Sequence, residues 1–290
     1  MIILDGKEVS LRCTELTKAR SSEFQRQNGR APGLAVILVG GDSASQVYVK
    51  NKIKSCEASG ILSFPHYLRA ETESSELEDL IESLNNKSEV DGILLQLPLP
   101  SHLDKEYFIE LIAPLKDVDG LGYDSLGRLW AGRPRVIPCT PKGVIRILKH
   151  YNLDLAGKRA VVIGRSEIVG KPMAQLLLME NATVTICHSK TKDINEYSRQ
   201  ADIVVVAAGR PRLFGKENFK KDSIVIDVGI HRIPDGNGTN TKLCGDVRFD
   251  ELAGHCLAAT PVPGGVGPMT IAMLLENTLD LATTNKVAKN

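Results

Sequence analysis

The stretch Arg159-Ala160-Val161-Val162-Ile163-Gly164-Arg165-Ser166-Glu167-Ile168-Val169-Gly170-Lys171-Pro172 decides the fold. Its apolar run up to Ile163 predicts a buried strand, and the glycines mark a turn into a helix that begins near Gly170. A strand, a glycine turn and a helix N-terminus form the anion-binding geometry of dinucleotide folds, because bare backbone lets a pyrophosphate approach the free amides of the helix. The stretch therefore predicts a phosphate-bearing dinucleotide at this turn.

The turn departs from the usual dinucleotide fingerprint. That fingerprint is G-x-G-x-x-G, whereas Gly164 to Gly170 runs G-x-S-x-x-x-G, with Ser166 in the place of the second glycine. A single turn of this kind is weak evidence when taken alone. A glycine connection that binds no ligand is the alternative interpretation.

The end of the next predicted strand distinguishes NAD from NADP. An NAD site usually places Asp or Glu about 20 residues after the glycines, where it holds the ribose 2′-hydroxyl. This chain has Cys187-His188-Ser189-Lys190-Thr191 there, with no carboxylate to repel a 2′-phosphate. Hydroxyl and cationic groups could hold that phosphate, and Arg165 in the turn adds positive charge. The segment favours NADP; the alternative is that His188 and Lys190 are solvated residues at a strand end.

Apolar strand-like runs alternate with longer amphipathic stretches along the rest of the chain. This alternation predicts an α/β protein with parallel sheets and crossover helices. We expect strands at 34–39, 64–68, 92–97, 159–163, 183–187, 203–208, 224–228 and 257–260, and helices at 43–59, 74–85, 140–151 and 268–282. The segment 127–141 is rich in glycine, proline and arginine and predicts a link between two domains. The last helix follows the second sheet, so we expect it to pack on the first domain.

The composition excludes several classes of function. The 290 residues, 42% of them hydrophobic, are enough for one large or two medium domains with cores of their own. The formal net charge of +1 gives no basic excess that would indicate nucleic acid. No apolar run approaches the roughly 20 residues that span a bilayer, and the first residues do not resemble a secretory signal. The six cysteines lack C-x-x-C spacing, which predicts reduced thiols in a cytoplasmic protein without a zinc site.

Polar residues in apolar surroundings are the candidates for chemistry. Tyr48 and Lys52 lie one helical turn apart, although a surface pair is the plainer interpretation of this spacing. Gln96, in a predicted strand, is either a satisfied core amide or a site residue. Asp117-Val118-Asp119-Gly120 is an acidic turn that lacks further metal ligands, with a solvated turn as the alternative. The bare backbone from Thr260 to Thr270 suits close approach of a flat ligand or of another domain, or is only a tight connection.

Six segments together resemble one family. They are Tyr48-Val49-Lys50-Asn51-Lys52, Asp91 to Pro100, Lys116 to Gly120, Pro138-Cys139-Thr140-Pro141, Gly164 to Pro172 and Pro261 to Thr270. They occur in the family's order over nearly the whole chain, and the strings P-V-P-G-G-V-G-P-M-T and D-G-I-L-x-Q-L-P-L-P are highly specific. The chain resembles the bifunctional methylenetetrahydrofolate dehydrogenase/methenyltetrahydrofolate cyclohydrolases, the FolD family.

The resemblance implies a two-domain α/β fold with a cleft between the domains. The expected parts are a folate-binding catalytic domain at 1–138, completed by the C-terminal helix 268–290, and a Rossmann-type NADP-binding domain at 139–267. The implied activity is oxidation of 5,10-methylenetetrahydrofolate by NADP to the methenyl cation, followed by hydrolysis to 10-formyltetrahydrofolate. The implied protein is a cytoplasmic homodimer that binds a reduced folate, with neither nucleic acid nor membrane as partner. Its one-carbon units serve purine, methionine and histidine biosynthesis.

The resemblance also implies roles for single residues. Lys52 matches the catalytic lysine, Tyr48 its partner on the helix, Gln96 the glutamine beside the lysine, and Asp119 the carboxylate that binds the pterin. The implied substrate contacts are Tyr48, Lys52, Leu95, Gln96, Leu97, Asp119, Pro263, Gly264, Gly265, Val266 and Gly267. The implied cofactor contacts are Gly164, Arg165, Ser166, Gly170, Ser189 and Ile230, and no metal is implied.

One segment departs from the family pattern. Many members carry a His-Pro pair soon after D-V-D-G, whereas this chain has Leu121-Gly122-Tyr123-Asp124. The segment flanks the expected cleft, so its substrate contacts are not carried over, and the catalytic assignment does not depend on them.

Two other functions compete with the bifunctional enzyme. One is a dehydrogenase that has lost the cyclohydrolase step. The other is a non-catalytic protein that binds a dinucleotide, against which the joint presence of Tyr48, Lys52, Gln96 and Asp119 argues.

Overall fold

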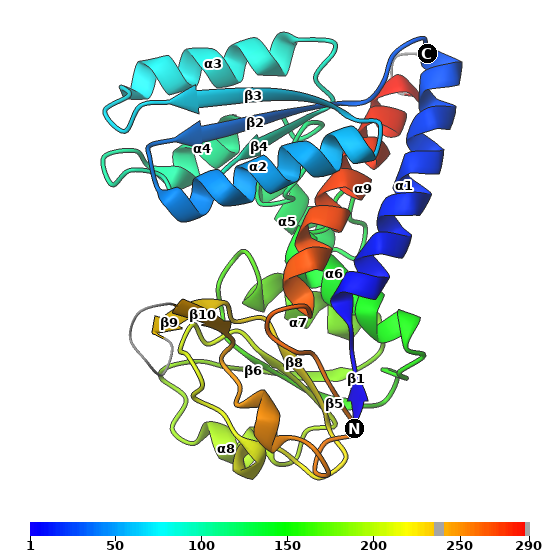
Figure 1. Cartoon of the computed structure of the whole chain (residues 1–290), viewed down its shortest axis with the longest axis vertical. Coiled ribbons are helices and arrows are strands. Elements are labelled where there is room, and N and C mark those ends of the chain that lie inside the picture. The colour runs from blue at the N-terminus through cyan, green and yellow to red at the C-terminus, as the bar shows by residue number, and fades with distance from the viewer. Residues whose placement is uncertain (235–240, 288–290) are drawn as a thin grey trace. The chain divides into compact units, whose positions relative to one another are not determined.

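The computed structural model describes residues 1–234 and 241–287 of the chain. The chain divides into two compact units, each built from two segments. The six-stranded unit consists of Met1–Leu11 and Thr140–Thr270, and the three-stranded unit of Arg12–Cys139 and Ile271–Asn290. The boundaries fall inside three helices, which are α1 (Gly6–Asn28), α6 (Cys139–His150) and α9 (Val266–Val287) (Figure 1). The predicted α/β class with two domains is confirmed.

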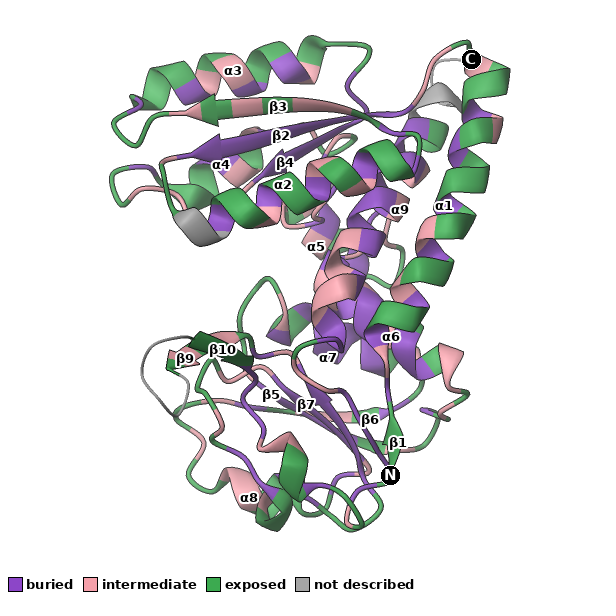
Figure 2. Ribbon diagram, viewed as in Figure 1, coloured by how far each residue is buried: buried purple, intermediate pink, exposed green. Residues whose placement is uncertain are grey.

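The three-stranded unit contains a parallel sheet in the order β3-β2-β4. Its strands are β2 (Gly33–Val39), β3 (Leu62–Leu68) and β4 (Gly92–Leu95), and its further helices are α2 (Ser43–Ala58), α3 (Ser74–Asn86), α4 (Lys105–Leu111) and α5 (Tyr123–Trp130). Every residue of the central strand β2 is buried, because helices cover both faces of the sheet (Figure 2). α3 contributes Leu77, Ile81 and Leu84, at helical spacing, to the core.

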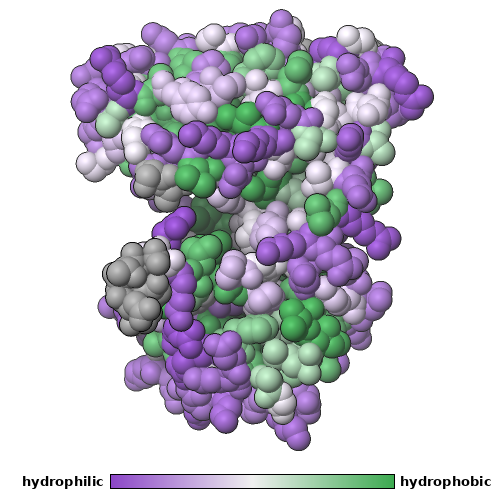
Figure 3. Space-filling view, in the orientation of Figure 1, coloured by the Kyte–Doolittle hydropathy of each residue, from purple (hydrophilic) through white to green (hydrophobic). Residues whose placement is uncertain are grey.

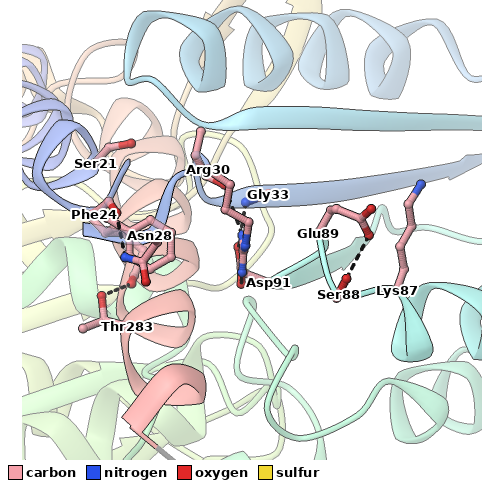
Figure 4. Close-up of polar contacts among 12 residues, drawn as sticks. Ser21, Phe24, Asn28, Arg30, Gly33, Lys87, Ser88, Glu89, Asp91 and Thr283 are labelled. Atoms are coloured by element: carbon pink, nitrogen blue, oxygen red, sulfur yellow. Dashed lines mark hydrogen bonds and ion pairs between the residues drawn. The ribbon is translucent and has the colours of Figure 1, made fainter. Parts of the chain in front are cut away.

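A buried carboxylate fixes the start of this sheet. Both terminal nitrogens of Arg30 donate to Asp91 at 2.7 Å, and the amide of Gly33 donates to the same carboxylate at 2.8 Å (Figure 4). Bidentate pairing of this kind is strong and directional. Because Gly33 begins β2 and Asp91 directly precedes β4, the contact joins the amino ends of two neighbouring strands. Their register therefore determines which residues emerge at the carboxyl ends, where Gln96 follows β4.

The six-stranded unit contains a parallel sheet in the order β1-β11-β8-β7-β5-β6. The strands are β1 (Ile2–Ile3), β5 (Arg159–Ile163), β6 (Thr183–Cys187), β7 (Ile203–Val206), β8 (Ile224–Asp227) and β11 (Ala258–Ala259). The unit also contains the helices α7 (Gly170–Met179) and α8 (Ile194–Ser198). A separate antiparallel pair is formed by β9 (His231–Pro234) and β10 (Thr241–Cys244). The chain runs from β5 to β6 on one side and then to β7 on the other. Such a reversal marks the place where open α/β sheets bind ligands, outside the carboxyl ends of the strands.

Both ends of the chain add to a unit that is built mostly from other segments. β1 pairs with β11, so Met1–Leu11 belongs to the six-stranded unit. A two-residue strand carries no periodicity, and the sequence gives no sign of it. In α9 the side chain of Asn277 donates to the carbonyls of Val118 at 2.8 Å and Ile137 at 2.9 Å, within the three-stranded unit. Of the helix expected at 268–290, residues 288–290 lie outside the described residues. The functional limits 1–138 and 139–267 stay a prediction.

The described residues contain no helix that is both long and apolar enough to cross a membrane. Hydrophilic side chains cover most of the face shown in Figure 3, with apolar residues in smaller patches. All six cysteines lie within the described residues and are buried, and none forms a disulfide bond. Within 1–234 and 241–287 no group of three His, Cys, Asp or Glu side chains is placed to hold a metal ion.

Candidate functional site

Helix α2 places Tyr48, Lys52 and Cys56 on one face, because each residue is four positions from the next. Lys52 is only 4% exposed, which is rare for lysine. Its Nζ donates to Oε1 of Gln96 at 2.9 Å and lies 4.7 Å from the centroid of the Tyr48 ring. Hydrogen bonding and a cation–π contact therefore replace part of the lost hydration of the ammonium. Tyr48 and Lys52 are not a pair of surface side chains.

Gln96 lies at the end of β4 and not inside it. We expected a strand through Leu97, but β4 ends at Leu95, and the amide of Gln96 makes the last contact with β2 by donating to the Ile37 carbonyl at 2.9 Å. The side-chain oxygen accepts from Lys52, and Nε2 donates to the Leu97 carbonyl at 2.6 Å. Both ends of the amide are satisfied, so Gln96 orients the ammonium without adding a charge.

The two aspartates of the D-V-D-G segment have different tasks. Asp117 is buried and accepts from the amides of Gly120 at 2.9 Å and Gly122 at 3.0 Å and from the Ser125 hydroxyl at 2.7 Å. These bonds use the carboxylate to shape the turn, which is therefore not merely solvated. Asp119 is half-buried, and its Oδ1 accepts from the Cys139 thiol at 3.4 Å. Asp119 is the aspartate whose charge acts on Lys52.

Burial changes the pKa values of Lys52 and Asp119 in the directions that favour the neutral form of each side chain. Loss of hydration lowers the pKa of Lys52, and the nearby Asp119 carboxylate opposes this shift. Loss of hydration likewise raises the pKa of Asp119; Lys52 opposes the rise and Asp117 adds to it. In this environment Lys52 can release and regain a proton closer to neutral pH than an exposed lysine can.

Two cysteines near Lys52 have no role in the sequence-based prediction. Cys56 is fully buried one turn beyond Lys52, and burial raises the pKa of its thiol to about 12. Cys139 contacts Asp119 through its thiol and receives a contact from Nδ2 of Asn277 at 3.5 Å. The spacing of Tyr48, Lys52 and Cys56 indicates the first cysteine. Cys139 lies in one of the six segments that resemble the family, but its contact with Asp119 joins positions 20 apart and has no local spacing signal.

The segment that departs from the family pattern has its own anchoring. The Tyr123 amide, in the first turn of α5, donates to Oε1 of Glu110 at 2.7 Å. A proline in this position would have no N–H to donate. Asp124 in turn forms ion pairs with Arg128 and Arg135, each at 2.9 Å. Hydrogen bonds and ion pairs within this chain therefore hold the segment in place.

The glycine turn of the six-stranded unit brings the end of β5 close to the end of β7 and to the start of α7. Gly164 follows β5 with φ +139°, and a Cβ there would lie 2.3 Å from the Ala207 carbonyl oxygen at the end of β7. Only glycine fits between these two strand ends. The Ser166 hydroxyl accepts from the amides of Val169 at 3.2 Å and Gly170 at 3.3 Å, where α7 begins. Ser166 thus supports the first turn of the helix, and Val169 at the N-cap makes no side-chain cap.

The other predicted cofactor residues lie at the same edge of the sheet. His188 to Thr191 form a turn after β6, in which the His188 amide donates to the Thr191 hydroxyl at 3.0 Å. Ser189 and Arg165 are exposed. Ile230 follows β8 and is 56% exposed. Gly164, Arg165, Ser166, Gly170, Ser189 and Ile230 therefore all belong to one unit and lie near the carboxyl ends of its strands.

The predicted substrate contacts are divided between the two units. Tyr48, Lys52, Gln96 and Asp119 lie in the three-stranded unit, together with Leu95, which is buried, and Leu97, which is partly exposed. The segment Pro263, Gly264, Gly265, Val266 and Gly267 belongs to the six-stranded unit. There the Gly264 carbonyl accepts from the Lys7 amide at 3.1 Å, and the Gly265 amide donates to the Pro261 carbonyl at 2.8 Å.

Both halves of the chain match one protein family. The family model of the tetrahydrofolate dehydrogenase/cyclohydrolase catalytic domain matches residues 4–119. The family model of the NAD(P)-binding domain of the same enzymes matches residues 138–286. The bifunctional protein FolD of Bdellovibrio bacteriovorus is 58% identical over 282 residues, which are 97% of this chain and 96% of that protein.

Solved structures agree over almost the whole length. The bifunctional FolD methylenetetrahydrofolate dehydrogenase/cyclohydrolase of Campylobacter jejuni superimposes with a TM-score of 0.94 at 48% identity, covering 98% of this chain and 99% of that one. The FolD enzyme of Trypanosoma brucei, solved with NADP and an inhibitor, has a TM-score of 0.94 at 38% identity, covering 99% of this chain and 98% of that one. The chain therefore belongs to the tetrahydrofolate dehydrogenase/cyclohydrolase family.

Proposed function

We propose that this protein oxidises 5,10-methylenetetrahydrofolate with NADP and hydrolyses the methenyl product to 10-formyltetrahydrofolate. The observation that carries the proposal is the buried Lys52, held by Gln96 and Tyr48 in a chain of this family. A protein that only binds a dinucleotide has no use for a desolvated lysine in its other unit. The cyclohydrolase step does, because it moves protons.

Lys52 is the proposed acid–base group of the hydrolysis. Addition of water to the methenyl carbon releases a proton, and opening of the ring then requires a proton on the departing nitrogen. A lysine with a lowered pKa can accept the first and supply the second. Gln96 fixes the direction of Nζ through its side-chain oxygen, and the Tyr48 ring covers the ammonium from another side. We assign Lys52, Tyr48, Gln96 and Asp119 as the catalytic residues.

Asp119 is proposed to hold the pterin ring. The amino group and the adjacent N–H of a pterin present two donors that a carboxylate can accept together. Cys139 contacts one oxygen of Asp119 only through a weak thiol donor. Leu95, Leu97 and the segment Pro263 to Gly267 are the further proposed substrate contacts.

NADP fits the glycine turn of the six-stranded unit. The bare backbone at Gly164 and the start of α7 suit a pyrophosphate, and the segment His188 to Thr191 contains no carboxylate to repel a 2′-phosphate. We assign Arg165 and Ser189 to the 2′-phosphate, Gly164, Ser166 and Gly170 to the turn, and Ile230 to an apolar contact. When bound, NADP supplies the acceptor for the hydride of the methylene group.

The finer expectations rest on family membership. We propose that the protein is a cytoplasmic homodimer whose products serve purine, methionine and histidine biosynthesis, with no nucleic-acid or membrane partner. Light scattering would give about twice the chain mass of 31.5 kDa for the dimer, and the mass of one chain would refute it.

The first prediction concerns the whole reaction. Purified protein mixed with 5,10-methylenetetrahydrofolate and NADP will form NADPH and 10-formyltetrahydrofolate, followed by absorbance, and NAD in a parallel assay will react more slowly. If the methenyl species accumulates without hydrolysis, the protein is a dehydrogenase alone. Tight NADP binding with no folate turnover would identify a binding protein instead.

The second prediction isolates Lys52. Lys52→Met removes the ammonium while keeping a flexible apolar chain, and we expect cyclohydrolase activity to fall by at least about 100-fold, the usual contribution of a positioned acid–base group. Binding of NADPH, measured by its fluorescence, will not change. Lys54→Met is the matched control, because Lys54 is on the same helix and exposed. Hydrolysis at the normal rate in Lys52→Met would remove Lys52 from the mechanism.

The third prediction tests the choice of cofactor. Ser189→Asp places a carboxylate where the 2′-phosphate is proposed to bind, so the KM for NADP will rise about tenfold or more, the effect of losing one charge-assisted hydrogen bond. The KM for NAD will change little, because NAD carries no 2′-phosphate. Cyclohydrolase activity on added methenyl substrate is the internal control. Equal effects on NADP and NAD would contradict the assignment of Ser189.

A further inference from the structure

Asp246 is a fully buried carboxylate that the proposed reaction does not use. It follows β10 in the six-stranded unit, and its side chain has 0% exposure. Oδ2 accepts from the amides of Ala208 at 2.7 Å and Gly209 at 3.0 Å. Oδ1 accepts from the amide of Arg210 at 2.8 Å and contacts Nε2 of His231 at 2.7 Å. Each oxygen thus has two partners, and three of the four are backbone amides.

The partners of Asp246 belong to segments that follow two neighbouring strands. Ala208, Gly209 and Arg210 come shortly after β7, whereas His231 follows β8 and is adjacent to Ile230. The backbone also passes close to this carboxylate, because a Cβ on Gly229 would lie 2.5 Å from Cγ of Asp246. One side chain therefore connects the backbone after β7 with the side chain of His231, which follows β8.

The same two segments form part of the edge where the cofactor is proposed to bind. Ala207, at the start of the segment held by Asp246, lies against Gly164 of the glycine turn. Ile230, next to His231, is the exposed apolar residue assigned to the cofactor. The position of Asp246 therefore sets the spacing between the glycine turn, the segment after β7 and Ile230.

We propose that Asp246 and His231 are positioning residues of the cofactor site, which hold the segments 207–210 and 229–230 in the arrangement that receives the dinucleotide. The inference rests on the proposed NADP site. Asp246 acts through the backbone that it fixes, and His231 closes the fourth hydrogen bond on the carboxylate. His231 is also paired with Cys244 in the hairpin that leads to Asp246, so its ring contact joins the two ends of that hairpin.

Asp246→Asn tests the carboxylate with almost no change of volume. An amide places an NH₂ group where one oxygen of Asp246 accepts from backbone N–H, so at least one hydrogen bond is lost. We expect the KM for NADP to rise about tenfold or more, the effect of losing a charge-assisted hydrogen bond. Cyclohydrolase activity on added methenyl substrate needs no dinucleotide and will stay within about twofold of the unaltered protein. A residue that merely stabilised the chain would not separate the two activities.

His231 supplies a second test that disturbs the fold less. His231→Ala removes one of the four partners of the carboxylate, and we expect a smaller rise in the KM for NADP, about threefold. His231→Gln keeps an N–H donor at a similar reach and will restore the KM. The matched control is Asp202→Asn, since Asp202 accepts from the Arg159 amide at 2.9 Å and pairs with Lys220 at 2.5 Å where β5 and β7 begin, at the opposite edge of the same sheet. Its KM for NADP will not change.

Defined outcomes overturn the proposal. It is wrong if Asp246→Asn leaves the KM for NADP within twofold, or if both activities fall together while the protein stays folded. If Asp246→Asn fails to fold, the two His231 variants test the proposal instead. A normal KM for NADP in His231→Ala, or no recovery of the KM in His231→Gln, refutes it. Ser189→Asp separates this inference from the cofactor site itself. If that variant also leaves the KM for NADP unchanged, the proposed NADP site has failed, whereas a raised KM there confines the failure to Asp246 and His231.

Discussion

Placing a lysine ammonium inside the three-stranded unit is the constraint on which its site depends. An ionised amine loses much of its hydration when it is buried, and the protein must replace that hydration or lower the pKa of the group. Lys52 shows both responses: the Gln96 oxygen and the Tyr48 ring contact the ammonium, while burial still lowers its pKa. A fully compensating carboxylate in direct contact would have held the proton more firmly. The neutral glutamine instead leaves Lys52 able to exchange it.

The parallel sheets determine where the candidate residues can gather. In both units the side chains of interest follow the carboxyl ends of strands, as Gln96 follows β4 and Gly164 follows β5. The ion pair between Arg30 and Asp91 fixes the amino ends of β2 and β4, so their register is set far from the chemistry. Asp246 has the corresponding task after β7 and β8, at the edge of the sheet that carries the cofactor residues. In both units, the strands are stabilised and the site residues are positioned by the same kind of contact, a buried carboxylate that accepts hydrogen bonds from backbone amides.

The sequence predicts the parts of this structure that have a local signal. The core strands, the helices after the glycine turn and after Gly41, and the position of Tyr48 and Lys52 on one helix face all follow from apolar periodicity or from spacing along one helix. The burial of Lys52 does not follow from that spacing, which favoured a surface pair. Elements with short or weak periodicity are not predicted from the sequence. Examples are β1, which has two residues, and α1, which has polar residues on most of its surface. Contacts between distant segments escape as well. Nothing near Asp246 in the sequence indicates that its carboxylate holds the amides of residues 208 to 210, because these contacts span 36 to 38 positions.

The aspartates show why residue type alone does not identify a site. Asp117 and Asp246 accept several hydrogen bonds each, mostly from backbone amides. These bonds occupy the carboxylate oxygens and hold the surrounding backbone in place. Asp119, two positions from Asp117, accepts from a thiol, which is a weak donor, and burial raises its pKa. A carboxylate whose oxygens are saturated by the protein cannot also bind a substrate, whereas a poorly satisfied one gains when a ligand supplies strong donors. The number and strength of the donors around each carboxylate, and not its place in the D-V-D-G segment, therefore separate the aspartate that shapes the site from the one that is available to a pterin.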